Sequence, residues 1–252
     1  MEILVCIKRY VLAGSEFVLT PDQTEIDSKN LGYTLAPHEE VAVEQAIRFV
    51  EEFGGSTTVL SLGVPEAEEQ MREQMAIGAD RGILLATDGS EWDPQATAAA
   101  IVDAVKAQPN AFDLILFGAE SADSNNSQVG IRVAHALGLP IVTNVRGVTI
   151  HDGVARCERV VGNNREVYDV TLPAVLTTRE GLNIPRYPSV PGRIKARKKP
   201  LDTLNPEKPA AKVEKVKLVV PPNQKTGATV LGQGADGASA AVAMMTEIGV
   251  LA

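Results

Sequence analysis

Short apolar runs alternate with amphipathic segments over the first part of the chain. The apolar runs predict buried strands at 2–7, 57–62, 82–86 and 114–117, and a further strand that begins at 140. Segments with apolar residues at helical spacing predict helices at 37–49, 65–77, 93–107 and 127–137. This order is typical of an α/β protein with a doubly wound, mostly parallel sheet and right-handed crossovers.

The pattern changes after Asn144. Alternating runs, separated by turn residues such as Asp152-Gly153, predict a short antiparallel meander over 144–172. We expect another buried strand at 173–178, a Pro-punctuated loop at 181–191 and a basic run at 192–200 that could form a short helix. A linker or extended arm at 201–215, a possible strand at 217–220 and a small-residue helix at 235–248 would follow.

Composition narrows the class of protein. The chain has 252 residues, 44% hydrophobic and only 4% aromatic, a mixture that suits helices packed on a parallel sheet. Its net charge of −8 argues against a nucleic-acid partner, and no stretch reads as a transmembrane segment or signal peptide. The two cysteines, Cys6 and Cys157, lie far apart, so we expect neither a disulfide framework nor a metal site, and a cytoplasmic location.

Residues 118–130, GAESADSNNSQVG, are the segment that most clearly indicates a binding site. They follow the apolar run at 114–117 and lead into a helix that starts around Asn126 to Gln128. The first N–H groups of a helix are unpaired and its dipole favours negative charge, so a loop of this kind can hold the phosphate of a nucleotide. The plainer interpretation is a well-capped turn between a strand and a helix.

The positions of three predicted strand ends are further evidence for a nucleotide site. Cys6, Leu62-Gly63 and Gly118 each lie at the end of a predicted strand. If these strands are parallel, the three ends share one edge of the sheet, where ligands bind at the switch point. We therefore expect an adenine nucleotide there.

Catalytic motifs are not found in the sequence. It contains no P-loop, no dinucleotide fingerprint after the first strand, no nucleophile elbow and no zinc-protease motif. Asp93 and Asp123 could act as general bases but are equally good helix caps. Of the three scattered histidines only His38 is expected near the carboxyl edge, and its plainer interpretation is an exposed first-turn residue.

Two segments could contact other proteins. The basic run at 195–199 is either a solvated surface or a docking patch, and the rigid segment Pro185-Arg186-Tyr187-Pro188 beside it suits recognition. The apolar residues of the final helix need a surface, either on their own domain or on another chain.

Four segments together resemble the β subunits of electron transfer flavoproteins over nearly the whole chain. They are ILVCIKR at 3–9, APHEEVAVEQAIR at 36–48, GADRGILL at 78–85 and, most specifically, LPAVLTTREGLNIPRYPSVPGRIKARKKP at 172–200. The resemblance implies a Rossmann-like sheet of the adenine nucleotide alpha hydrolase type. It also implies a heterodimer with an α subunit that carries FAD.

In that family the β subunit is an electron carrier subunit rather than an enzyme with its own substrate. The resemblance implies AMP bound structurally in this chain, flavin dehydrogenases as donors, and a quinone oxidoreductase of the respiratory chain as acceptor. It divides the chain into a nucleotide-binding domain, 1–192, and a linker and arm, 193–252, that docks on the α subunit. The loop for donor recognition would be 183–197.

Carried over position by position, the resemblance assigns two sets of residues. The nucleotide contacts would be Cys6, Ala36, Pro37, His38, Glu39, Leu62, Gly118, Ala119, Asp123, Asn126, Ser127, Gln128, Val129 and Gly130. The residues for partner recognition would be Pro185, Arg186, Tyr187, Val190, Pro191, Ile194 and Lys195, with Val190 as the apolar anchor.

Several positions depart from the family pattern. Ala36 replaces an Asn, His38 stands where an aromatic residue often lies near the flavin and could hydrogen-bond the flavin ring, and Val190 replaces Leu. An electron-bifurcating β subunit, which binds a second FAD and oxidises NADH, remains an alternative. The Asp-Thr pair of that branch is missing before Gln128, although Gln128, Val129 and Gly130 match it. A stand-alone adenine-nucleotide-binding regulatory module is a further alternative.

Overall fold

A computed structural model describes residues 1–12, 18–213, 215–220 and 229–251 of the chain. The chain divides into two compact units, Met1–Lys217 and Leu218–Ala252. The second unit contains a 3₁₀ turn, η2 (Gly234–Gly237), and the helix α6 (Ala238–Glu247). In the described residues, no helix is long and apolar enough to span a bilayer.

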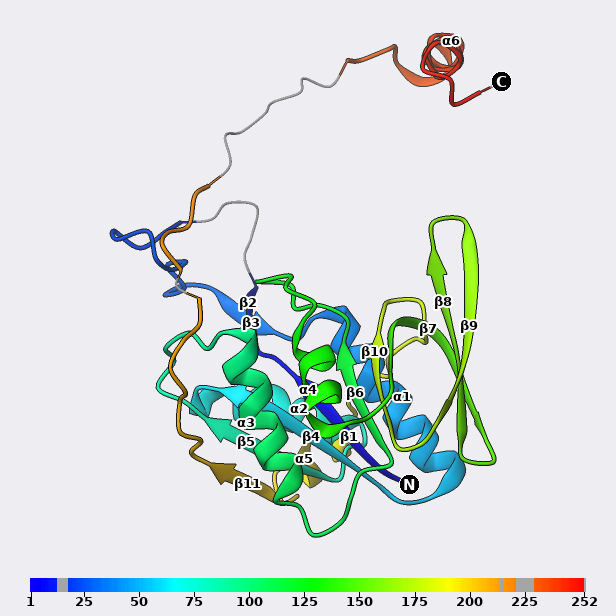
Figure 1. Cartoon of the computed structure of the whole chain (residues 1–252). Helices are drawn as coiled ribbons and strands as arrows, with labels where there is room; N and C mark the ends of the chain where they lie inside the picture. The colour runs from blue at the N-terminus through cyan, green and yellow to red at the C-terminus, as the bar shows by residue number, and fades with distance from the viewer. Residues whose placement is uncertain (13–17, 214, 221–228, 252) are drawn as a thin grey trace. The chain divides into compact units, whose positions relative to one another are not determined.

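The first unit is built on a nine-stranded sheet with the order β11-β5-β4-β1-β6-β10-β7-β8-β9 (Figure 1). The strands are β1 (Glu2–Ile7), β4 (Ser56–Gly63), β5 (Arg81–Ala86), β6 (Leu114–Gly118), β7 (Ile141–His151), β8 (Val154–Val161), β9 (Asn164–Thr171), β10 (Ala174–Thr178) and β11 (Leu201–Leu204). Pairings from β11 to β7 are parallel, and those of β7 with β8 and β8 with β9 are antiparallel. The predicted doubly wound, mostly parallel sheet with its meander is confirmed.

Helices cover both faces of the sheet because its central strand is apolar on both sides. In β1, Ile3 and Val5 pack into one core, whereas Leu4 and Cys6 pack into the other. The first core contains side chains of α1 (Pro37–Phe53), α2 (Glu68–Ile77) and α5 (Val190–Ala196), with the 3₁₀ turn η1 (Pro65–Ala67) before α2. The second contains side chains of α3 (Pro94–Lys106) and α4 (Val129–Leu137).

The strand order places a switch point between β1 and β6. The chain runs from β1 to β4 and β5 on one side of β1 and then crosses to β6 on the other side. Cys6 is in register with Leu60 of β4 and with Phe117 of β6. The ends of these strands therefore share one edge of the sheet, as expected, and the region where ligands bind in such sheets lies between β1 and β6.

The structure corrects several expected elements. A small hairpin, β2 (Tyr10–Leu12) with β3 (Gly32–Thr34), was not predicted, because strands of three residues are too short to show alternation. The expected linker is wrong at its start, where β11 pairs with β5 at the sheet edge. Residues 217–220 form no strand.

Some helix boundaries also move. α5 begins at Val190, inside the expected loop, because the Ser189 hydroxyl accepts a hydrogen bond from the Gly192 N–H and caps the helix. α4 begins at Val129, slightly later than expected. The helix expected from Pro65 opens as the 3₁₀ turn η1 and becomes α-helical at Glu68.

Candidate functional site

The N-terminus of α1 lies directly against the end of β6. A Cβ added to Gly118 would lie 2.8 Å from Cγ of Glu39 and 3.2 Å from Cβ of His38, so only glycine permits this approach. The Thr178 hydroxyl, at the end of β10, donates to the carbonyls of His38 (2.8 Å) and Phe117 (3.2 Å). The segment Pro37–Glu39 and Gly118, predicted from distant parts of the sequence to share a site, are thus adjacent.

Glu39 is a buried carboxyl group at this junction. It accepts backbone N–H groups from Lys8 (2.8 Å) and Ala36 (3.1 Å), which joins the end of β1 to the start of α1. Burial raises the pKa of Glu39 to about 8, against the opposing effect of these two hydrogen bonds. Burial also raises the pKa of the neighbouring Cys6 thiol, so that Cys6 stays a neutral, apolar part of the wall.

The loop between β6 and α4 leaves the N-terminus of α4 open. Gln128 is the N-cap residue, and among the described residues no side chain caps the helix. The side-chain oxygen of Gln128 instead accepts from Arg132, at 2.9 and 3.2 Å. The first N–H groups of α4 therefore have no side-chain acceptor, which favours an anion site over the well-capped turn.

Two acidic side chains beside this helix end are paired with cations. The carboxylate of Asp123 contacts the Lys8 ammonium at 2.7 and 2.9 Å, and that of Glu120 contacts Arg179 at 2.8 Å. Burial would raise the pKa of Asp123, but the Lys8 charge and the hydrogen bonds from Lys8, Ser121 and Ser124 together outweigh it and hold the pKa below its usual value. Asp123 thus caps no helix here, and the carboxylates are neutralised where a phosphate would lie.

His38 is not the exposed first-turn residue considered from the sequence, because its side chain is only 18% exposed. Its Nδ1 accepts the backbone N–H of Glu180 at 3.2 Å, and its Nε2 lies 3.6 Å from the Glu120 carboxylate. The accepted N–H leaves the proton of the neutral ring on Nε2. The segment after β10 covers the ring, which sequence spacing does not reveal.

Sequence reasoning missed Thr178 and Arg179, assigned no role to Lys8, and placed Glu120 in the loop without foreseeing its ion pair. Thr178 and Arg179 reach the site because β10 pairs with β6, a neighbour relation that the chain order does not indicate. The available signal for Lys8 was its position directly after the central strand.

Leu62 lies in β4, one strand from β1, and Gly130 packs against Thr177 and Phe117. Over the described part of the chain, no cluster of His, Cys, Asp and Glu suits a metal ion.

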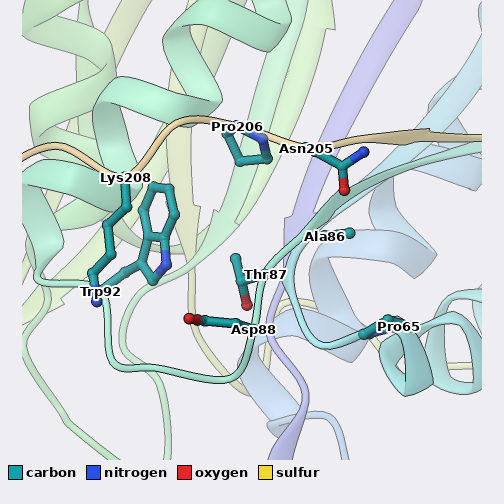
Figure 2. A pocket seen from close by; sticks show the side chains of 8 residues that line it. All are labelled: Pro65, Ala86, Thr87, Asp88, Trp92, Asn205, Pro206 and Lys208. Atoms are coloured by element: carbon teal, nitrogen blue, oxygen red, sulfur yellow. The ribbon is translucent and has the colours of Figure 1, made fainter.

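A cavity of about 310 Å³ lies further along the same edge of the sheet (Figure 2). It is lined by Pro65, Ala86, Thr87, Asp88, Trp92, Asn205, Pro206 and Lys208, from the ends of β4, β5 and β11. A second cavity, of about 610 Å³, adjoins the opposite end of β1 and includes Met1 and Phe53. Neither is lined by a residue predicted to contact the nucleotide.

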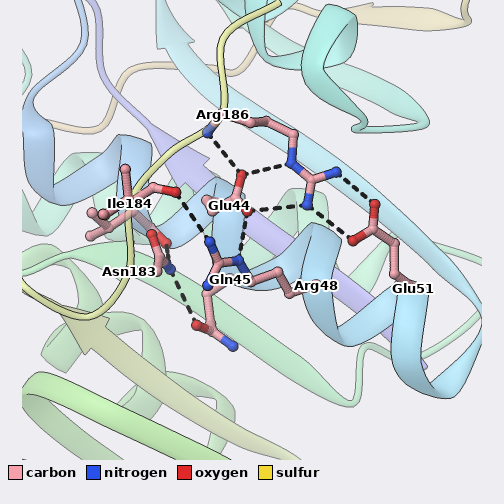
Figure 3. Close-up of polar contacts among 8 residues, drawn as sticks. Glu44, Gln45, Arg48, Glu51, Asn183, Ile184 and Arg186 are labelled. Carbon is pink, nitrogen blue, oxygen red and sulfur yellow. Dashed lines mark hydrogen bonds and ion pairs between the residues drawn. The ribbon is translucent and has the colours of Figure 1, made fainter.

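The residues expected to recognise a partner do not all face outward. Tyr187, Val190, Pro191, Ile194 and Lys195 are exposed, Pro185 is half-buried, and the Arg186 side chain is 37% exposed. Arg186 turns back onto α1, where it contacts two carboxylates (Figure 3). The outward side chains form a mainly apolar surface.

Comparison with known proteins gives one consistent result. A family model described as the electron transfer flavoprotein domain matches residues 24–209. The chain is 32% identical to "Electron transfer flavoprotein subunit beta" of Bacillus subtilis, over 97% of each chain. It is 35% identical to the protein of the same name from Syntrophomonas wolfei, over 90% of this chain and 88% of the other. It is also 35% identical to "Caffeyl-CoA reductase-Etf complex subunit CarD" of Acetobacterium woodii, over 82% of this chain and 79% of the other.

Proposed function

Since this chain belongs to the electron transfer flavoprotein family, among its β subunits, we propose that it binds AMP at the switch point between β1 and β6. It works beside an α subunit that holds FAD, and the pair carries electrons in the cytoplasm. The FAD supplies the redox chemistry. The tasks of this chain are to support the α subunit, to contact its flavin and to dock the electron donor.

The observation that carries the AMP proposal is the open N-terminus of α4. Its free N–H groups, around Ser127 to Val129, suit a phosphate, and the paired Asp123 and Glu120 do not oppose one. The adenosine would lie against Cys6 and the start of α1, beside Gly118. Because AMP binds only the folded chain, it would stabilise the native state.

The test is the nucleotide content of the purified heterodimer, released by denaturation and separated by chromatography. We expect one AMP and one FAD per heterodimer. Two FAD and no AMP would support the second-flavin alternative instead. Gel filtration of the chain expressed alone addresses the stand-alone module, which predicts a well-behaved monomer.

A substitution locates the site. In Gln128→Glu a carboxylate at the N-cap can occupy the N–H groups meant for the phosphate, so we expect AMP retention to fall at least about tenfold. His135→Gln, later on the same helix, is the control and should retain AMP. Undiminished AMP in Gln128→Glu would contradict this location.

The exposed surface of Tyr187, Val190 and Ile194 would dock a flavin dehydrogenase as donor, with Val190 as the apolar anchor, and a quinone oxidoreductase would accept the electrons. The C-terminal arm would dock on the α subunit. In the second unit, α6 and the residues after it expose Val242, Met244, Met245 and Ile248, which need an apolar partner.

A further inference from the structure

The loop at 183–189, which leads into α5 and carries Tyr187 of the docking surface, has no helix or strand. It is nevertheless held by an arginine clamp, which consists of Arg186, Glu44 and Glu51 (Figure 3). The Arg186 guanidinium donates to the Glu44 carboxylate at 2.9 and 3.1 Å. It also donates to the Glu51 carboxylate at 2.6 and 3.0 Å. One planar side chain thus fastens the loop to two turns of α1.

The clamp closes on a buried anchor. The side chain of Glu44 is 2% exposed and also accepts the Arg186 backbone N–H (3.1 Å) and the Arg48 side chain (2.6 Å). Arg48 in turn donates to the carbonyl of Ile184 (3.1 Å), and the Asn183 amide donates to the carbonyl of Val41 (2.9 Å). The chain is therefore fixed to α1 on both sides of Pro185.

The charges keep this clamp formed at neutral pH. Burial would raise the pKa of Glu44, but the hydrogen bonds from Arg186 and Arg48 outweigh it and hold the pKa below its usual value. The hydrogen bond from Arg186 lowers the pKa of Glu51 as well. Both carboxylates are ionised, and the guanidinium remains charged.

On the other side of the loop, apolar side chains point into solvent. Ile184 is 84% exposed, Tyr187 is 95% exposed and Val190 is 73% exposed. A loop that presented these residues without support would have to be ordered on binding, and that ordering lowers affinity. Contacts on its inner side supply the order beforehand.

We propose that Arg186 is a positioning residue for donor docking: it touches no partner and holds the apolar surface in the shape that the donor binds. This inference rests on the proposed function. The inference goes further than the proposed function, because it attributes the shape of the docking loop to the arginine clamp on α1.

The first measurement reports the loop directly. A nitroxide spin label is attached at Tyr187→Cys in the full chain; the native Cys6 and Cys157 are buried and should not be labelled. Arg186→Lys keeps a positive charge for Glu44 but cannot bridge two carboxylates, so we expect a more mobile label. Arg156→Gln is the control, because it removes an arginine–carboxylate pair in the β8–β9 hairpin. Equal label mobility in all three chains would overturn the proposal.

The second measurement reports docking, without the label. A flavin dehydrogenase that reduces the wild-type heterodimer is held at fixed concentration, and the heterodimer is varied. For Arg186→Lys we expect KM to rise about tenfold, equivalent to about 1.4 kcal/mol, with kcat within about twofold. Glu51→Gln, which leaves buried Glu44 paired, should raise KM in the same direction. An unchanged KM, or a fall in kcat alone, would refute the positioning role.

The two hypotheses fail in different ways. If no flavin dehydrogenase reduces the wild-type heterodimer, the proposed function is wrong, whereas the label still reports on the clamp. If the wild type is reduced and Arg186→Lys behaves like it, only the positioning role of Arg186 is wrong.

Discussion

Lys199 offers a sharp test of how the basic run at 195–199 contributes to the fold. Its ammonium donates to the carbonyls of Met75 (3.0 Å), Gly78 (3.3 Å) and Ala79 (2.7 Å), at the C-terminus of α2. Partial burial lowers the pKa of Lys199. The side chain is therefore a helix cap rather than part of a solvated surface.

Lys199→Met keeps the aliphatic stem and removes all three hydrogen bonds. A hydrogen bond to a charged group contributes about 1.5–3 kcal/mol, and bonds that share one donor do not add, so we expect a loss of about 2–3 kcal/mol. For a protein of this size, that loss lowers the melting temperature by about 5–10 °C. The reciprocal contact, from Arg72 to the carbonyls of Ala196 and Lys199, keeps α5 in place.

Thermal unfolding of the full chain, followed by circular dichroism, measures the effect. The matched control is Lys198→Met, because Lys198 is the preceding residue and is exposed. It should change stability by less than about 0.5 kcal/mol. Equal melting temperatures for the two variants would show that the three carbonyls gain nothing from Lys199, and the capping argument would be wrong.

Two further predictions concern carboxylates. Because the pKa of Glu39 is raised from 4.5 to about 8, the folded chain keeps a proton in this pH range that the unfolded chain releases. The free energy of unfolding of the wild type should therefore fall as the pH rises through the range, by up to about 1.4 kcal/mol per pH unit. Glu39→Gln should remove this pH dependence. If the melting temperature changed by the same amount between about pH 6 and about pH 8 in both chains, the prediction would be wrong. Asp93 accepts the Ala96 N–H (2.7 Å) and the Lys212 N–H (2.8 Å), so Asp93→Ala should cost about 1 kcal/mol in urea unfolding, and Asp93→Asn less. Equal losses in the two variants would argue against a capping role.

The sheet was predictable because its central strands are rich in apolar residues, as in Leu114–Phe117, and burial on both faces favours this composition. The edge strand β11 was not predictable, because only Leu201 of its four residues is even half-buried. The hairpin β2–β3 lacks a signal because each of its strands has only three residues. Strands can be predicted from the sequence where burial imposes a pattern of apolar residues, and an exposed edge strand such as β11 has no such pattern.

The candidate site divides along the same line. Gly118, Gln128 and Gly130 could be selected from sequence, because a glycine-bordered loop between a strand and a helix is a local feature. Lys8 and Arg179 could not, because their ion pairs with Asp123 and Glu120 join segments that are distant in the chain. Arg186 was noticed in the sequence, but the direction of its side chain was not foreseen.

The central strands, the main helices, the loop before α4 and the family could be identified from the amino-acid sequence, since these depend on local patterns and on runs of matching residues. The folded structure was needed to show which charges neutralise one another at the switch point and which side of the docking loop faces α1. Those outcomes depend on which strands are neighbours and on the packing of distant segments, and a linear pattern encodes neither.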